Sequence, residues 1–326
     1  MPAATPLRRL TVAQYRQSIA DLLGPSITLP DDLEADTEVD GFVALGAART
    51  TPSARGVDQY AAAAYALAHQ VLSDETSRPT FVGCSPASPN DGACARQFVA
   101  RFGRRTFRRP LADGEIERYA SLFEGAVAVI GDFHASLEYV VSAMLQSPHF
   151  LYRSEIGQPD PIDPTRRVLD PFELAARLSY FFWNTTPDDV LLEAAAKGET
   201  LTDDGLGRQI DRLASSHRAG EAQRQFFSEL FRLGRLDILP QLPAYYPAMS
   251  PTFGASAREE TLRLVQDVIS RGADYRELFR SKRGFLNAEM SALYGTPSDS
   301  DAVAATLPDE RAGILDRKST RLNSSH

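Results

Sequence analysis

The sequence lacks long apolar runs and an excess of positive charge. No stretch of about 18 consecutive apolar residues occurs among its 326 residues, so no segment predicts a membrane-spanning helix. Residues 1–10 also lack the apolar centre of a signal peptide. The formal net charge is −8, which argues against a nucleic-acid partner, because such binding depends on basic side chains that neutralise phosphates. With 43% hydrophobic residues, the composition instead predicts a globular protein of two or three small domains.

Cysteine is scarce, since the sequence contains only Cys84 and Cys94, on either side of a loop rich in Pro, Asn and Gly. Zinc sites need thiols about two to four residues apart and a second such pair, which this sequence does not have. The C-x-x-C-H motif is also absent, so we expect no covalent haem and no other cofactor in this chain. Two interpretations are open, namely two separate buried thiols or a disulfide that closes the loop before a helix. We favour the disulfide, which implies an oxidising compartment.

One acidic loop imitates part of a calcium site. Residues 31–41, DDLEADTEVDG, place Asp36, Glu38 and Asp40 at the spacing of the first half of a calcium-binding loop. The carboxylate required at the twelfth position falls on Ala47, so the second half does not fit. We therefore expect a solvated acidic loop and no metal site, and we keep a calcium- or glycan-binding protein as an alternative.

Apolar residues at helical spacing recur along the chain together with helix caps. A capping box of Thr11 and Gln14 begins one helix, and Asp170 with Glu173 begins another after the proline-rich linker GQPDPIDPT. The following helix is expected to begin at Thr186 on the same pattern. Other helices are expected at residues 56–72, in three segments between 93 and 146, and at 203–215, 220–233, 256–271 and 287–294. Because strand signals are few, the sequence predicts an all-α fold of irregular multi-helix bundles with little or no sheet.

We expect these helices to form two or three consecutive small helical domains. Turn-rich stretches and the proline-rich linker indicate where one domain ends and the next begins. The expected segments are an N-terminal helical domain at 1–78, a Cys-loop with three helices at 79–157, a larger helical domain at 158–297, and the start of a truncated further domain at 298–315.

Recognised catalytic motifs are absent from the sequence. It contains no H-E-x-x-H, no G-x-S-x-G and no phosphate-binding glycine loop. The candidates for a site lie at breaks between helices, and they are His149 with Arg153 and Glu155, and Asp188 and Asp189 in the segment from Trp183 to Asp189. Such breaks need polar anchors for structural reasons alone, so we favour structural junctions over an active site.

Five arginines gather in one stretch, ARFGRRTFRRP. They are Arg101, Arg104, Arg105, Arg108 and Arg109. A cluster of this kind suits an anionic ligand, because guanidinium groups bind oxyanions well. We expect these arginines to pair instead with the acidic side chains of the protein itself.

Several stretches, in succession, resemble one known family. They are PLRRLTVAQYRQSIADLLG, CARQFVARFGRRTFRRPLADGEIERYASLF, MLQSPHFLYRSE, LDPFELAARLSYFFWNTTPDDVLLEAAAKG, GFLNAEMSALYG and RAGIL. In this order they resemble the planctomycete-type series of domains of unknown function. Proteins of that family are large exported bacterial proteins, many of which carry a c-type cytochrome domain elsewhere in the chain. The resemblance covers most of residues 7–315 and supplies no catalytic residues.

The resemblance implies export to the periplasm or the cell surface, and a partner that is a cytochrome c domain or another exported protein. The molecular function stays unknown at this point. Our leading hypothesis is a non-catalytic helical module that scaffolds or docks a cytochrome-bearing partner or a missing haem domain. The alternative is a periplasmic enzyme of polymer breakdown, with a site near His149 and the junction from Trp183 to Asp189.

Both ends of the sequence suggest a fragment. Proteins of the resembled family usually begin with a signal or lipoprotein peptide and continue beyond the segment that is similar to RAGIL. The last eleven residues, DRKSTRLNSSH, correspond to one reading frame of a common sequencing-library adapter. We therefore expect residues 316–326 to be an artefact that does not pack against the rest of the protein.

Overall fold

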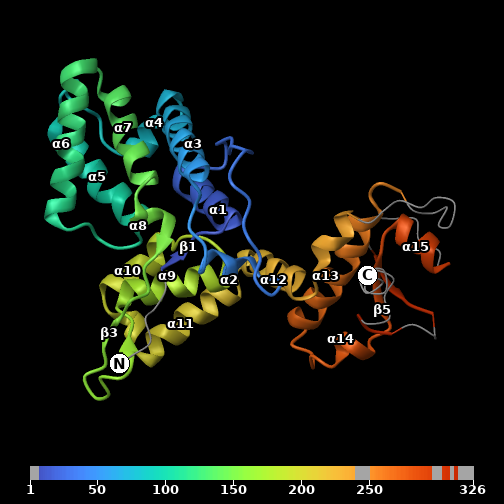
Figure 1. The fold of residues 1–326 in the computed structure, drawn as a ribbon. Coiled ribbons are helices and arrows are strands. Elements are labelled where there is room, and N and C mark those ends of the chain that lie inside the picture. Colours follow the sequence, from blue (N-terminus) through green and yellow to red (C-terminus); the bar gives the residue numbers. More distant parts are fainter. Residues whose placement is uncertain (1–6, 239–249, 296–302, 309–311, 315–326) are drawn as a thin grey trace. The chain divides into compact units, whose positions relative to one another are not determined.

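The structure is almost wholly helical. In this computed structural model, the described residues are 7–238, 250–295, 303–308 and 312–314. Within them the chain has fifteen α-helices, two 3-10 helices and three short antiparallel strand pairs. The prediction of an all-α fold with little sheet is therefore confirmed. The chain forms two compact units, residues 1–219 and residues 220–326 (Figure 1).

Unit 1, residues 1–219, contains most of the helices and two of the strand pairs. Its α-helices are α1 (Val12–Leu23), α2 (Val43–Ala47), α3 (Ala54–Ser73), α4 (Arg78–Val82), α5 (Gly92–Phe107), α6 (Asp113–Ile130), α7 (Phe133–Leu145), α8 (Pro148–Leu151), α9 (Pro171–Phe182), α10 (Asp189–Ala196) and α11 (Asp203–Ala214). A 3-10 turn, Glu199–Leu201, precedes α11. The two antiparallel pairs are β1 (Arg8–Arg9) with β2 (Tyr152–Arg153) and β3 (Gln158–Pro159) with β4 (Arg167–Val168).

The helix starts that the sequence marks with capping boxes are observed at α1 and α9. The Thr11 hydroxyl accepts a hydrogen bond from the Gln14 amide at 3.1 Å, and the Gln14 side chain accepts one from the Thr11 amide at 3.2 Å. At α9 the Asp170 carboxylate accepts from the amide of Glu173 at 2.8 Å. Both caps satisfy backbone amides that have no partner within the helix.

The predicted start of the next helix at Thr186 is wrong. The N-cap of α10 is Asp188, whose carboxylate accepts a hydrogen bond from the Leu191 amide at 2.9 Å. Thr186 is buried instead, and its hydroxyl donates to the backbone carbonyl of Arg105 at 3.4 Å. Both residues can cap a helix. The contact of Thr186 with the distant helix α5 cannot be read from the local pattern.

The main hydrophobic core of unit 1 lies between α1, α3, α5, α6 and α7. Helix α3 packs along α7, and α6 packs on both α5 and α7. A smaller core joins α9, α10 and α11. The largest fully buried side chains of the main core are Tyr15, Phe98, Phe102, Phe123 and Phe150. The sequence-based boundaries near residues 78 and 157 both lie inside unit 1, and they stay predictions.

Unit 2, residues 220–326, has its own hydrophobic cores around helix α13. Its elements are most of α12 (His217–Leu230), a 3-10 helix at Leu233–Ile238, α13 (Phe253–Ser270), α14 (Glu277–Arg280), β5 (Arg283–Leu286), α15 (Ala288–Tyr294) and β6 (Val303–Thr306), and β5 pairs with β6. Of the expected further domain at 298–315, only residues 303–308 and 312–314 are described. The segment 316–326 lies outside the described residues. No helix of the described residues is long and apolar enough to cross a membrane.

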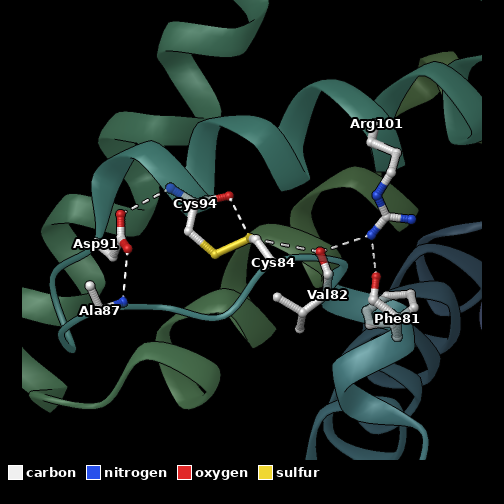
Figure 2. The surroundings of a disulfide bond; sticks show 7 residues. All are labelled: Phe81, Val82, Cys84, Ala87, Asp91, Cys94 and Arg101. Atoms are coloured by element: carbon white, nitrogen blue, oxygen red, sulfur yellow. Dashed lines mark hydrogen bonds between the residues drawn. A yellow bond between two sulfur atoms is a disulfide. The ribbon is translucent and has the colours of Figure 1, made fainter.

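A disulfide joins Cys84 and Cys94, with the two Cα atoms 5.9 Å apart, and the predicted bond is confirmed (Figure 2). It closes the loop that precedes α5. The Asp91 carboxylate accepts hydrogen bonds from the amides of Cys94 at 3.0 Å and Ala87 at 2.9 Å, so one side chain caps α5 and holds the loop. Farther along α5, Arg101 donates to the carbonyl of Val82 at 2.9 Å. The loop is therefore held by the disulfide at its ends and by Asp91 within it.

We predict that the double variant Cys84→Ser, Cys94→Ser has a lower free energy of unfolding by about 2–3 kcal/mol, because the unfolded chain regains the entropy of a short loop. Urea unfolding followed by circular dichroism measures this change. Reduction of the unmodified protein with dithiothreitol should give a loss of the same size. A loss below about 0.5 kcal/mol in both experiments would contradict the prediction.

Candidate functional site

The polar centre of unit 1 is the side chain of Arg108, directly after α5. Its backbone has a φ of 62°, in the left-handed region, which ends the helix. The residue is only 4% exposed, and its guanidinium donates to the carbonyls of His149 at 2.6 Å, Phe150 at 3.1 Å and Tyr152 at 2.7 Å. These carbonyls lie in and directly after α8, where helix amides no longer satisfy them. Arg108 therefore joins the end of α5 to the end of α8.

Tyr180 of α9 connects the same centre to two further elements. Its hydroxyl accepts a hydrogen bond from Arg108 at 3.2 Å and shares another with the Ser18 hydroxyl of α1 at 3.2 Å. The guanidinium carbon of Arg153 in β2 lies 5.0 Å from the centre of the Tyr180 ring, and that of Arg108 lies 5.7 Å away. Both distances are within the range of a cation–π interaction. The centre thus links α1, α5, β2 and α9.

The structure brings two of the sequence candidates, Arg153 and Glu155, together. Glu155 is 3% exposed, and its Oε1 lies 3.7 Å from the Arg153 guanidinium. Its other oxygen, Oε2, is held more closely by Arg177 of α9, at 2.7 Å from one guanidinium nitrogen and 2.9 Å from another. Burial lowers the pKa of Arg153, and the charge of Glu155 acts against this shift. The Glu155 carboxylate therefore interacts more strongly with Arg177 than with Arg153.

His149, the leading sequence candidate, lies at the surface of α8. Its side chain is 53% exposed, its ring centre lies 5.3 Å from that of Phe107, and its Nε2 lies 3.7 Å from the Glu115 carboxylate. That distance is too long for a hydrogen bond. Partial burial and then the charge of Arg109 lower the pKa of His149, which favours the neutral imidazole. Among the described residues, no hydroxyl or thiol is hydrogen-bonded to the ring, so the arrangement lacks an activated nucleophile.

Glu115 is itself committed to Arg109. The two side chains form a two-point ion pair with distances of 2.8 and 2.9 Å, and the same carboxylate accepts from the Ala112 amide at 2.9 Å. The hydrogen bonds from Arg109 lower the pKa of Glu115 from 4.5 to about 2. The carboxylate beside His149 thus acts as a helix cap and ion-pair partner.

The segment from Trp183 to Asp189 forms a second junction. The Trp183 indole donates to the Leu213 carbonyl at 2.9 Å, and its ring lies near the guanidinium groups of Arg212 and Arg218, at 5.3 and 5.2 Å. Asp188 pairs with Arg212 at 2.7 Å, and Asp189 lies 3.8 Å from Arg105. These contacts join α9, α10 and α11. Asp188 and Asp189, the two candidate carboxylates of this segment, are thus both in ion pairs with arginines.

The acidic loop does not gather its carboxylates into a metal site. Asp36 is held by the Arg9 guanidinium at 2.9 Å and by the Val12 amide at 2.7 Å, and its burial raises its pKa. In the part of the chain that the structure describes, no group of three or more His, Cys, Asp or Glu side chains is placed to hold a metal ion. Asp36, Glu38 and Asp40 therefore form no such group there.

The arginines of α5 all point to acceptors within unit 1. Arg104 pairs with Glu193 at 3.2 Å, and Arg105 donates to the Asp21 carbonyl at 2.9 Å. The sequence suggests acidic partners for the whole cluster, and Arg104, Arg105 and Arg109 have them. It does not reveal that Arg108 binds backbone carbonyls. The only local signal is the place of Arg108 directly after the apolar run of α5, where a helix-capping side chain belongs.

Comparison with known families identifies the chain. Residues 8–73, 94–155 and 169–296 match, in this order, three families described as proteins of unknown function, DUF1587, DUF1595 and DUF1592. The chain therefore belongs to the proteins that carry the planctomycete-type series of domains, as its resemblance implies. No curated protein and no solved structure is significantly similar to it. The families carry no assigned activity, so the match leaves the molecular function unknown.

The matched segments meet at the centre described above. Ser18 belongs to the first segment, Arg108 and Arg153 to the second, and Tyr180 to the third. The side chains that join them are the hydrogen-bonded and stacked groups around the Tyr180 ring. The best-defined polar site of unit 1 is thus a junction between family segments.

We predict that Arg108→Met lowers the free energy of unfolding by about 3 kcal/mol or more, because it leaves three carbonyls at the end of α8 without their charged donor. The control is Arg104→Met, which removes a surface ion pair and should cost less than about 1 kcal/mol. Urea unfolding of both variants measures the difference. An equal loss of unfolding free energy in the two variants would show that the Arg108 contacts matter no more to stability than a surface ion pair.

We predict a pH-dependent contribution from Glu115. Its pKa in the folded protein, about 2, lies below the usual 4.5, so the stabilisation is complete above about pH 4.5 and is lost as the pH falls toward 2. Because the pair lies near the surface, we expect about 1 kcal/mol. Glu115→Gln should be less stable than the unmodified protein at pH 6 and equally stable near pH 2. A difference that is independent of pH would contradict this origin.

Proposed function

We propose that this chain is a non-catalytic helical module of an exported protein, and that it scaffolds or docks a cytochrome-bearing partner or a haem domain of the same polypeptide. The observation that carries the proposal is that the polar side chains at the helix junctions bind other groups of the same protein. Arg108 and Glu155 are buried, and Asp188 caps α10. All three side chains make contacts that join helices. Polar groups that are engaged by internal partners in this way hold a fold together.

The disulfide supports the location outside the reducing cytosol. Disulfides persist in oxidising compartments and are rare where glutathione and thioredoxin keep thiols reduced. Cys84 and Cys94 are the only cysteines of the chain, and both are used in the bond. We place the module in the periplasm or at the cell surface, in agreement with the exported proteins that the family resemblance implies.

The cytochrome partner is supported by the family resemblance and by the lack of a haem-attachment motif in this chain. Without C-x-x-C-H, the chain does not hold a c-type haem covalently. Covalently attached c-type haem associated with the module would therefore be carried by another part of the polypeptide or by a second protein. The module would then hold that group in place by protein–protein contacts.

Two measurements test this proposal. Intact cells that express the full-length gene are treated with iodoacetamide before lysis, and mass spectrometry then shows whether Cys84 and Cys94 are protected as a disulfide. The purified full-length protein and its crosslinked partners are examined for the pyridine haemochrome spectrum of c-type haem. We expect protected cysteines and covalent haem.

Each outcome bears on a separate part of the proposal. Alkylated cysteines would contradict export, and the absence of covalent haem from both the polypeptide and its crosslinked partners would contradict the cytochrome role. The scaffold role itself would be wrong if the purified chain degraded a polymer and His149→Ala abolished that activity. An Arg16→Ala variant, changed at a partly exposed arginine of α1, serves as the control for that assay.

A further inference from the structure

The β1–β2 strand pair, which joins the first and second matched family segments, places two arginines opposite each other. Strands β1 and β2 pair antiparallel, with Arg8 directly opposite Arg153. Side chains of directly opposite residues lie on the same face of a strand pair, with Cβ atoms about 4.5–5.5 Å apart. Like charges in that position repel each other. The pairing therefore carries an electrostatic cost that must be offset.

The surrounding charges offset it only in part. Burial lowers the pKa of Arg153, and the charges of Glu155 and then Tyr180 act against this shift. The charges of Arg8 and Arg108 add to it, so three guanidinium groups interact at this place. The nearest carboxylate, Glu155, lies 3.7 Å from Arg153 and is bound more closely by Arg177. Arg153 and Arg177 thus share one carboxylate, while Arg8 and Arg108 add positive charge near Arg153, which leaves a local excess of positive charge.

Arg8 and Arg153 also differ from their neighbours in their hydrogen bonds. The guanidinium of Arg108 donates to four acceptors, and that of Arg9 donates to Tyr60 and Asp36. In the described residues, neither Arg8 nor Arg153 donates a side-chain hydrogen bond, and the Nε atoms of both, like that of Arg9, are buried without a partner. The side chain of Arg153 is only 11% exposed, and Glu155 Oε1, 3.7 Å away, is too far to accept a hydrogen bond from it. A buried donor without an acceptor is costly, so a ligand that accepts hydrogen bonds would stabilise this pair.

We propose that Arg8 and Arg153 form a clamp for a small oxyanion, either a phosphate or a carboxylate group. The planar guanidinium offers parallel N–H donors that match the oxygens of such groups. A negative charge between the two arginines would cancel their repulsion and supply the missing acceptors. Arg8 is partly exposed, so the anion reaches the clamp from solvent.

The clamp would link two of the matched family segments. Arg8 begins the segment 8–73, and Arg153 lies near the end of the segment 94–155. An anion bound to both side chains holds the first strand of the chain against the end of the second segment. Binding of the anion therefore raises the stability of unit 1 in proportion to its concentration.

Inorganic phosphate is the probe for the experiment. The thermal unfolding midpoint of the full chain is measured against phosphate concentration, with sodium chloride at matched ionic strength as the reference. We expect a saturating rise of about 2–4 °C with phosphate and none with chloride. A rise with acetate that equals or exceeds the phosphate rise assigns the clamp to carboxylates. If neither oxyanion gives a rise beyond that of chloride, the proposal is wrong.

The variant Arg8→Met separates the clamp from a purely structural role. It should abolish the phosphate-dependent rise while leaving the midpoint in chloride unchanged or higher, because the repulsion is removed with the charge. The control Arg16→Met lies on α1, where Arg16 donates to the Pro30 carbonyl at 2.7 Å, and it should keep the full rise. A rise that persists in Arg8→Met would overturn the proposal. If Arg8→Met does not fold, Arg153→Lys decides, since it keeps the charge, loses the paired donors and should weaken the rise.

Discussion

The structure of unit 1 depends on a buried guanidinium that binds backbone carbonyls. Arg108 ends α5 in a left-handed conformation, and its guanidinium donates hydrogen bonds to the carbonyls at the end of α8 that have no helical partner. One residue thus ends one helix through its backbone and supplies donors to the carbonyls at the end of another through its side chain. This contact fixes the start of β2, because the Tyr152 carbonyl accepts a hydrogen bond from Arg108 and Arg153 comes next in the chain.

The same interaction explains how the first two family segments and the beginning of the third are joined within unit 1. Tyr180 of the third segment accepts a hydrogen bond from Arg108 of the second and shares one with Ser18 of the first. Buried polar groups need partners, so no segment can complete its polar contacts at this centre alone. The junction is built from residues that are close in space and far apart in sequence, since Ser18 and Tyr180 are separated by 162 positions.

Local features of the fold could be predicted from the sequence, and distant contacts could not. The caps at Thr11 and Asp170 and the Cys84–Cys94 bond involve residues close together in the chain, so spacing and residue type are sufficient to suggest them. The start of α10 was misplaced, since the burial of Thr186 against α5 depends on the folded arrangement. At the candidate site, the closeness of Arg153 and Glu155 could be anticipated. The closer contact of Arg177 with Glu155 could not be anticipated, because no local pattern in the sequence shows that α9 packs beside residues 152–155.

The surroundings of Trp183 have a consequence for spectroscopy. It is the only tryptophan in the chain, it is 7% exposed, and its ring lies near two guanidinium groups. Its neighbours come from α11 and from the start of α12, and the charged groups stay close to the indole only while these helices are packed on α9. The emission of a single buried indole depends on nearby charge and on access of water. The intrinsic fluorescence of this protein is therefore a site-specific signal for one helix junction, with no background from any other tryptophan.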